Sequence, residues 1–171
     1  TICRHFLLPY LERFHKEHPE IKLRIMNRTT PELCDMLKAG DIDLGLVNLP
    51  IEESEIEVRK CMGVHDIFVC GDSFVHELNK PLSLDEIVHF PLILLEKKSN
   101  SRQFVERWFQ TKGVSLAPEI ELGSHELLLE FAKINLGFAC VIREFSQDYL
   151  QGGLLYEIPL VNPIPPRSIG Y

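Results

Sequence analysis

The apolar positions in the first half of the chain alternate between helical and strand spacing. Residues 7–17 carry apolar side chains at the three-to-four-residue interval of an amphipathic helix, which a His-Pro pair ends. Residues 21–25 alternate apolar with basic side chains, the two-residue period of a half-buried strand. Residues 29–40 are predicted to form a second helix, opened by a Thr-x-x-Glu capping-box spacing, and residues 42–49 the strand that follows it.

The same alternation continues after an apolar strand predicted at Val64–Cys70. The later elements are a short helix at 83–88, a strand at 91–95, a helix at 103–112, a strand at 120–122, a helix from 124 to 131, and strands at 137–142 and 154–160. Strands separated by helices of about ten residues indicate crossover connections and a mostly parallel sheet. The sequence therefore predicts an α/β protein with two doubly wound lobes, one on each side of Val64–Cys70.

Small polar residues stand at several predicted strand-to-helix turns. They are Thr1, Thr29 or Thr30, Asn100 or Ser101, and Ser124. Ligands of open α/β sheets bind beyond the carboxyl ends of the strands, where helix N-termini offer unpaired N–H groups and a partial positive charge. Plain helix capping accounts for any one of these residues. Two such starts fall in each lobe, however, and as a set they favour a site for a small anion or polar molecule between the lobes.

Composition narrows the function classes. The 171 residues are 45% hydrophobic and 25% charged, as in ordinary globular proteins, and their apolar runs are too short to cross a bilayer. A net charge of −7 argues against this segment gripping nucleic acid by itself. The five cysteines form no C-x-x-C pair, so no disulfide framework is expected and a reducing cytoplasm fits best.

Catalytic and metal sites find little support in the motifs. The chain has no G-x-S-x-G elbow, P-loop or H-E-x-x-H, so we expect no enzyme and no catalytic residues. Cys61 and His65 are more readily explained as a packed thiol and a surface histidine than as a catalytic pair. His15 and His18, with Cys3-x-His5 nearby, could hold a metal only if further ligands converged, and no metal or other cofactor is expected.

The order of motifs resembles the effector-binding domain of LysR-type transcriptional regulators. Leu8-Pro9-x-Leu11-x-x-Phe14 resembles the opening of that domain. The segment from Thr29-Thr30 to Ile42-Asp43-Leu44-Gly45-Leu46 resembles its second helix and third strand. Leu136-Gly137-Phe138-Ala139 and Gly153-Leu154-Leu155 resemble two later segments, so the resemblance covers essentially the whole chain.

The resemblance implies a fold and an assembly. The fold is two Rossmann-like lobes joined by two crossing strands, like type II periplasmic binding proteins. Lobe I would be residues 1–66 plus 158–171 and lobe II residues 67–157, with crossings near 64–70 and 155–160. Members pair as homodimers, form tetramers at full length, and contact DNA only through an N-terminal winged helix-turn-helix that is absent from these 171 residues. The implied setting is the cytoplasm, without membrane attachment.

The resemblance also implies a binding pocket for a small-molecule effector. Its lining would be Thr1, Ile2, Thr29, Thr30, Asn48, Ser99, Asn100, Ser101, Ser124, His125 and Phe138. Some relatives place an arginine where this chain has Asn48, which argues against a strongly charged di-acid effector. Two alternatives share the fold: a solute-binding protein of the periplasmic type, and a redox-sensing regulator that uses Cys140 or Cys70.

Overall fold

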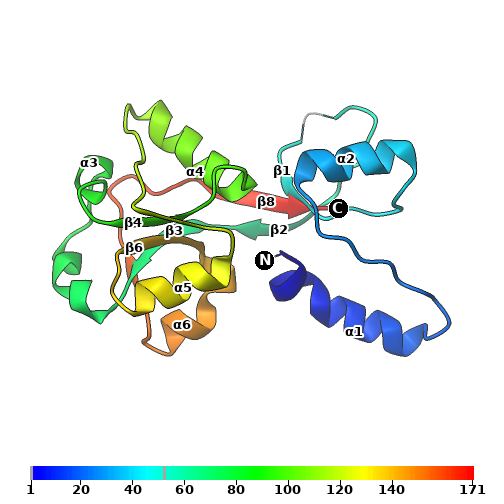
Figure 1. Ribbon diagram of the computed structural model, residues 1–171, viewed down its shortest axis with the longest axis horizontal. Helices are drawn as coiled ribbons and strands as arrows, with labels where there is room; N and C mark the ends of the chain where they lie inside the picture. The colour runs from blue at the N-terminus through cyan, green and yellow to red at the C-terminus, as the bar shows by residue number, and fades with distance from the viewer. Residues whose placement is uncertain (1, 52) are drawn as a thin grey trace.

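The structure, a computed structural model that describes residues 2–51 and 53–171, consists of two lobes side by side (Figure 1). The lobe I elements are η1 (Cys3–Leu7), α1 (Leu8–Glu17), α2 (Thr30–Ala39), β1 (Val47–Leu49), β2 (Lys60–Val64) and β8 (Arg167–Gly170). The lobe II elements are β3 (Asp66–Cys70), η2 (Asp72–Asn79), α3 (Leu84–Ile87), β4 (Leu92–Leu95), α4 (Asn100–Thr111), β5 (Ile120–Leu122), α5 (His125–Lys133), β6 (Phe138–Ile142), η3 (Arg143–Phe145), α6 (Gln147–Gln151) and β7 (Tyr156–Ile158). The two-lobed α/β fold predicted from the sequence is confirmed.

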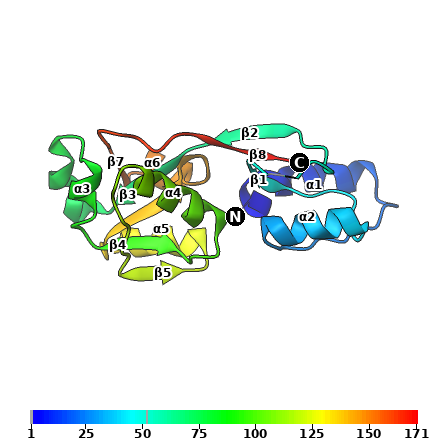
Figure 2. The same ribbon diagram turned by 90° about the horizontal axis from the view of Figure 1, so that it is seen from above.

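The strand order shows how the chain joins the lobes. Lobe I has a three-stranded sheet in the order β1-β8-β2, and lobe II a five-stranded sheet in the order β5-β4-β6-β3-β7. The chain enters lobe II between β2 and β3 and returns between β7 and β8, so β2 and β8 run side by side from one lobe to the other (Figure 2). β7, expected near the return crossing, pairs with β3 inside lobe II, and residues 159–166 make the return.

The prediction of mostly parallel sheets is only partly correct. β4 runs parallel to β5 and β6, as crossover helices require. β3, in contrast, is antiparallel to β6 and β7, and every strand pair described in lobe I is antiparallel. The physical reason is the double passage between lobes, because strands that enter a sheet from the other lobe run against their neighbours.

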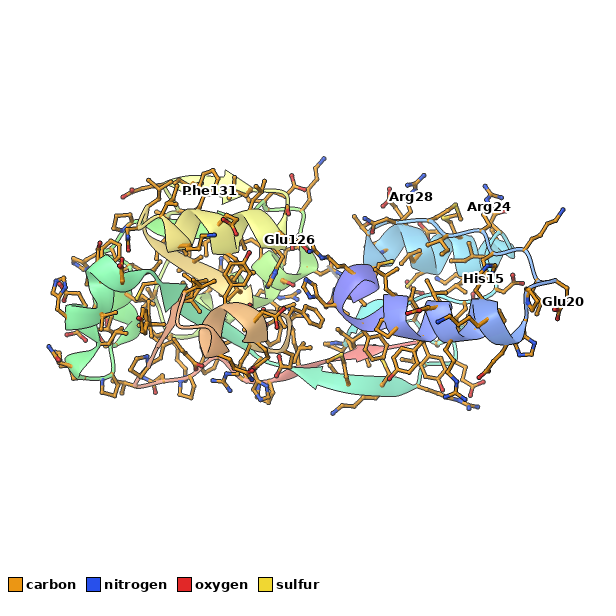
Figure 3. The ribbon with its side chains drawn as sticks, turned by 90° about the horizontal axis from the view of Figure 1, so that it is seen from below. His15, Glu20, Arg24, Arg28, Glu126 and Phe131 are labelled. Carbon is orange, nitrogen blue, oxygen red and sulfur yellow. The ribbon has the colours of Figure 1, made fainter. Side chains whose placement is uncertain are left out.

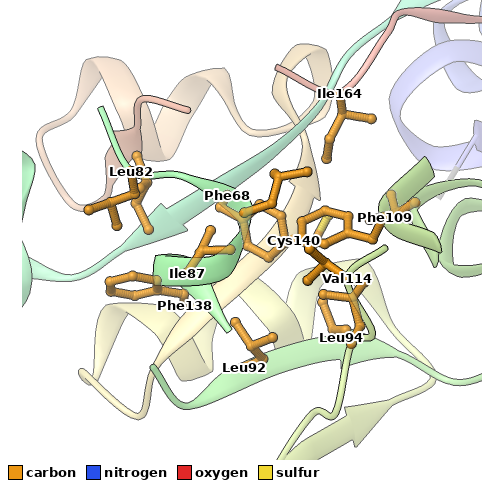
Figure 4. Close-up of a cluster of buried hydrophobic side chains, with 14 of the residues drawn as sticks. Phe68, Leu82, Ile87, Leu92, Leu94, Phe109, Val114, Phe138, Cys140 and Ile164 are labelled. Atoms are coloured by element: carbon orange, nitrogen blue, oxygen red, sulfur yellow. The ribbon is translucent and has the colours of Figure 1, made fainter. Parts of the chain in front are cut away.

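The core of lobe II lies on both faces of its sheet. Successive strand side chains point to opposite faces of the sheet. Leu92 and Phe138 pack toward α3 and α4 (Figure 4), whereas Ile93 and Ala139 pack toward α5. Continuous apolar strands such as β6 therefore signal a sheet covered on both faces.

Lobe I departs from the sequence prediction at two strands. Residues 21–25 form no strand, and the strand expected over residues 42–49 is confined to β1. Ile25 is 56% exposed and Leu44 64% exposed. A strand requires a neighbour for its backbone hydrogen bonds, and neither residues 21–25 nor residues 42–46 have a neighbouring strand among the described residues. Apolar alternation in these segments was therefore not sufficient for a strand.

The helix signals of lobe I are confirmed. The Glu32 carboxylate accepts the backbone N–H of Thr29 at 2.8 Å and the Thr29 hydroxyl at 2.7 Å, which completes the start of α2. Gly40 ends α2 with φ of 74°, a left-handed conformation that glycine adopts without strain. No helix in the described part of the chain combines the length and the hydropathy needed to span a membrane.

Candidate functional site

A cavity of about 230 Å³ lies between the lobes, at the N-terminal ends of α2 and α4. Lobe I contributes α2, β1, β8 and the segment after β1, and lobe II contributes α4. The lining residues are Thr30, Pro31, Cys34, Asn48, Leu49, Pro50, Ile51, Glu53, Asn100, Gln103, Phe104, Arg107 and Arg167. Helix N-termini at the wall of a mixed polar and apolar cavity are suited to small polar or anionic molecules.

Arg167 is the most connected side chain of this wall. Its Nε donates to Asp66 Oδ2 at 2.6 Å, and its Nη2 donates to Asp66 Oδ1 at 3.0 Å and to Ser101 Oγ at 2.7 Å. Its Nη1 donates to the side-chain oxygen of Asn48. Arg167 is 5% exposed and Asp66 4% exposed, so the ion pair is essentially buried. Burial at this level is tolerated because each charge has its partner and several hydrogen bonds.

A second polar contact joins the two lobes in the cavity wall. The amide nitrogen of Asn100, the first residue of α4, donates to the hydroxyl of Thr30, the first residue of α2. Together with the Arg167–Ser101 bond, this contact joins residues of β8 and α2 in lobe I to the start of α4 in lobe II. The relative position of the lobes is therefore coupled to polar groups in or next to the cavity wall.

The structure places three of the expected pocket residues in the cavity wall and a fourth in contact with it. Thr30, Asn48 and Asn100 line the cavity, and Ser101 contacts Arg167. Thr29 faces solvent and acts as the cap of α2. Ser99 is the residue before α4 and is not among the residues that line the cavity. Thr1 lies outside the described residues.

Ser124 and His125 lie at a different contact between the lobes. Glu126 stands at the end of α5 that faces the N-terminal helix (Figure 3), where its Oε1 is 3.3 Å from His5 Nε2 and 3.5 Å from Arg4 Nη1. The Ser124 hydroxyl donates to Glu126 Oε2 at 2.8 Å. Burial raises the pKa of Glu126, but hydrogen bonds from Ser124, its own backbone N–H and His5 outweigh that effect and lower it to about 2.

His125 is a neutral, buried ring in this contact. It is 1% exposed, and its Nε2 accepts the backbone N–H of Ile142 at 3.1 Å. Burial, followed by the nearby charge of His5, lowers the pKa of His125 to about 4. Its Nδ1 has no hydrogen-bond partner among the described residues. The ring packs edge-on against His5, with centroids 5.8 Å apart.

The two apolar residues expected in the pocket lie in packed clusters. Ile2 packs at the junction of the lobes against a cluster that includes Val64 and Ile169. Phe138 is fully buried in the lobe II core (Figure 4). Its ring is stacked on that of Phe90, with the centroids 4.3 Å apart. It is not among the residues that line the cavity. Its position at the first residue of β6 points it toward α3 rather than toward lobe I.

Sequence reasoning missed Asp66 and Arg167. A faint signal exists, because Asp66 is a single acidic residue within the apolar run Val64–Cys70. An acid in a buried strand requires a partner, but that partner is 101 positions away and no local spacing points to it.

The metal and redox alternatives gain no support from the geometry. Within residues 2–51 and 53–171, no group of three or more His, Cys, Asp or Glu side chains could hold a metal ion. Burial raises the pKa of the Cys70 thiol to about 11 and that of Cys140 well above its usual value. Thiols held in the protonated form are poor nucleophiles toward oxidants.

Comparison with known families decides the assignment. The family model described as "LysR substrate binding domain" matches residues 1–171. The chain belongs to this family. The family comprises effector-binding domains of transcriptional regulators and not enzymes. This result confirms the resemblance found in the sequence and argues against the solute-binding alternative.

Individual relatives are distant. The "Uncharacterized HTH-type transcriptional regulator YeiE" of Escherichia coli K12 is 22% identical over 165 residues, 96% of this chain and 55% of that protein. The "HTH-type transcriptional activator CmpR" of Synechocystis is 22% identical over 139 residues, 81% of this chain and 46% of that protein. The LysR substrate binding domain described here thus spans about half the length of the curated relatives it matches.

Solved structures show the same fold. The Synechocystis PCC6803 CcmR regulatory domain in complex with 2-PG superposes with a TM-score of 0.81, at 16% identity, over 99% of this chain and 82% of that chain. The effector binding domain of QuiR in complex with shikimate gives a TM-score of 0.79, at 15% identity, over 99% of this chain and 81% of that chain.

Proposed function

We propose that this LysR substrate-binding domain binds a small polar or anionic effector in the interlobe cavity and thereby controls a transcriptional regulator. The observation that carries the proposal is the cavity wall itself. Thr30 of α2, Asn48 of β1 and Asn100 of α4 present uncharged polar groups to one cavity from both lobes. The complexes of CcmR with 2-PG and QuiR with shikimate support an effector of this size class.

The proposed mechanism is a shift in the angle between the lobes. An effector that occupies the cavity competes with, or bridges, the Thr30–Asn100 contact, and so changes the relative stability of open and closed arrangements. The free energy available for this shift is the difference in effector affinity between the two arrangements. A ligand that binds both arrangements equally does not regulate.

The remaining partners belong to the same proposal. The full-length protein carries a DNA-binding domain N-terminal to this chain, acts in the cytoplasm, and assembles as a homodimer or tetramer. Exposed apolar side chains on α1 and α5, among them Leu8, Tyr10, Leu127 and Phe14, support pairing through helix faces. Through that assembly, the change in lobe angle alters the arrangement of the DNA-binding domains.

The test is a thermal-unfolding screen of this domain against small carboxylates, amino acids, sugar phosphates and inorganic anions, with 2-PG and shikimate included. A ligand at one hundred times its dissociation constant stabilises the folded state by about 2.7 kcal/mol. Thr30→Val is expected to weaken any hit by about three- to tenfold, the contribution of one hydrogen bond.

Thr29→Val is the matched control, because the neighbouring threonine caps α2 and faces solvent. It is expected to lower stability without changing ligand affinity. A saturable ligand whose affinity is the same in wild type, Thr30→Val and Asn100→Ala contradicts the cavity assignment.

A further inference from the structure

The guanidinium of Arg167 forms part of the cavity wall, but its charge is already matched inside the protein. Both carboxylate oxygens of Asp66 accept its hydrogen bonds, at 2.6 and 3.0 Å. The two side chains are 5% and 4% exposed, so solvent screens this pair poorly. The β8 end of the cavity therefore contains an arginine without presenting a net positive charge.

The hydrogen-bond donors of Arg167 are nearly exhausted. A guanidinium has five N–H groups. Nε uses one on Asp66, Nη2 uses two on Asp66 and Ser101, and Nη1 uses one on Asn48. One Nη1 N–H is left without a partner in residues 2–51 and 53–171. It can serve one acceptor atom of a ligand.

Neither of the other two charged side chains of the wall forms a hydrogen bond or an ion pair with Arg167 in the described part of the chain. Glu53 is paired with Lys38, and Arg107 is exposed to solvent on α4. Arg167 contacts the side-chain oxygen of Asn48, and the wall also offers the amide of Asn100 and the hydroxyl of Thr30, all of them uncharged. The polar end of the cavity is thus a set of neutral groups around a neutralised ion pair.

We infer that Asp66 is a specificity-determining residue, and that the Arg167 end of the cavity takes an uncharged acceptor, such as a hydroxyl or an amide oxygen, and disfavours a carboxylate or phosphate. A carboxylate that pairs with Arg167 through both of its oxygens has to displace the Asp66 carboxylate, which then lies buried without its cation. A carboxylate that takes only the remaining N–H places a second negative charge beside buried Asp66, where solvent screens the repulsion poorly. An uncharged oxygen takes the remaining N–H and leaves the pair intact. The inference rests on the proposed function and narrows it to a class of effector.

Acetate and acetamide test the inference, because they have the same shape and differ in charge. The thermal midpoint of unfolding is measured for wild type and Asp66→Asn, at constant ionic strength, with chloride as the reference anion. Wild type is expected to respond to acetate no more than to acetamide. Asp66→Asn is expected to gain about 2 °C or more in acetate and not in acetamide, because the vacated guanidinium takes the added carboxylate.

Two further substitutions and a second measurement complete the test. Adding Arg167→Gln to Asp66→Asn is expected to abolish the acetate gain. Arg107→Gln, the other arginine of the wall, is expected to leave it unchanged. If Asp66→Asn is unfolded in chloride, circular dichroism replaces the thermal midpoint as the measurement. The folded fraction is then expected to rise in acetate and not in acetamide.

Two results overturn the inference. One is an acetate-specific stabilisation of wild type that Arg167→Gln removes and Arg107→Gln does not, which shows that Arg167 accepts an anion with Asp66 in place. The other is an Asp66→Asn protein that gains nothing from acetate. Both results are obtained without the natural effector. An effector that binds wild type and Thr30→Val with equal affinity would therefore contradict the proposed function but leave the outcome of the acetate test unchanged.

Discussion

The two lobes are made of the same kinds of element, but they are packed very differently. In lobe II, α4 buries three residues and α5 buries four against opposite faces of one sheet. The structure describes every residue of α1 and α2 in lobe I. None of the ten residues of α1 is buried, and Cys34 is the one buried residue of α2. Lobe II is therefore the stable body of the domain, and lobe I is the part with little apolar burial of its own.

This difference indicates where regulation can act. Lobe I is attached through β2, β8 and a small apolar cluster at the junction, together with polar contacts at the cavity and at Glu126. Elements with few buried apolar contacts occupy the low end of local stability and move most readily. A ligand that adds a few hydrogen bonds at the Thr30–Asn100 contact therefore contributes a free energy comparable to that of the contacts between the lobes.

The largest predicted effect separates the two lobes directly. Phe109→Ala, in the lobe II core, is expected to lower the free energy of unfolding by about 3–5 kcal/mol, because Phe109 is fully buried. Phe14→Ala, on α1, is expected to lower it by less than about 1 kcal/mol. Urea unfolding followed by far-ultraviolet circular dichroism, which reports the helices of both lobes, measures both losses. Equal losses would remove the distinction between the lobes.

The sequence predicted lobe II better than lobe I for a physical reason. Apolar runs such as 138–142 and amphipathic helices such as α4 carry their signal locally, and neighbouring elements exist to bury them. The alternation at 21–25 is equally clear, but it states only which side chains share a face. It does not state whether a neighbouring strand is present, and in this structure none pairs with it.

The candidate site, too, was predictable only where its signal is local in the sequence. Thr30, Asn100 and Ser101 follow from their positions at helix starts, whereas Asn48 was assigned to the pocket from the resemblance. Phe138 was assigned to the pocket from the resemblance, but as a residue of a strand covered on both faces it packs in the core. Asp66 and Arg167 escaped because a buried ion pair across 101 positions leaves no spacing to read.

The second prediction concerns the contact between His125 and lobe I. Because the pKa of His125 falls to about 4 in the folded state, the unfolded chain binds a proton that the folded chain does not between pH 6.5 and 4. Stability at neutral pH is therefore lost as the pH falls through this window, by about 3 kcal/mol for this group. Urea unfolding at pH 7, 5.5 and 4 measures the loss.

His125→Gln separates this ring from the other titrating groups. Glutamine keeps an acceptor for the Ile142 N–H and does not titrate. Between pH 7 and pH 4, the free energy of unfolding of the variant is expected to fall by about 3 kcal/mol less than that of wild type. An unchanged pH dependence would mean that another group is responsible and that His125 is solvated in solution.

The third prediction is a local effect within lobe I. Thr29→Ala removes the hydroxyl that contacts Glu32 at the start of α2, and is expected to cost about 1 kcal/mol. Because lobe I is the less stable part, we expect faster hydrogen exchange at the amides of α2 and unchanged exchange in β3 and β6. Uniform acceleration in both lobes would show that they unfold as one unit.

The smallest predicted effect tests the strand that the sequence predicted and the structure lacks. Ile25→Thr places a hydroxyl at a position that is 56% exposed, and is expected to change the free energy of unfolding by less than about 0.5 kcal/mol. Ile169→Thr makes the same substitution in β8, where the side chain is fully buried, and is expected to cost about 2 kcal/mol or more. Comparable losses at both positions would mean that residues 21–25 pack in a sheet in solution. The conclusion that lobe I buries few apolar side chains would then be wrong, because the apolar alternation at residues 21–25 would mark a buried strand.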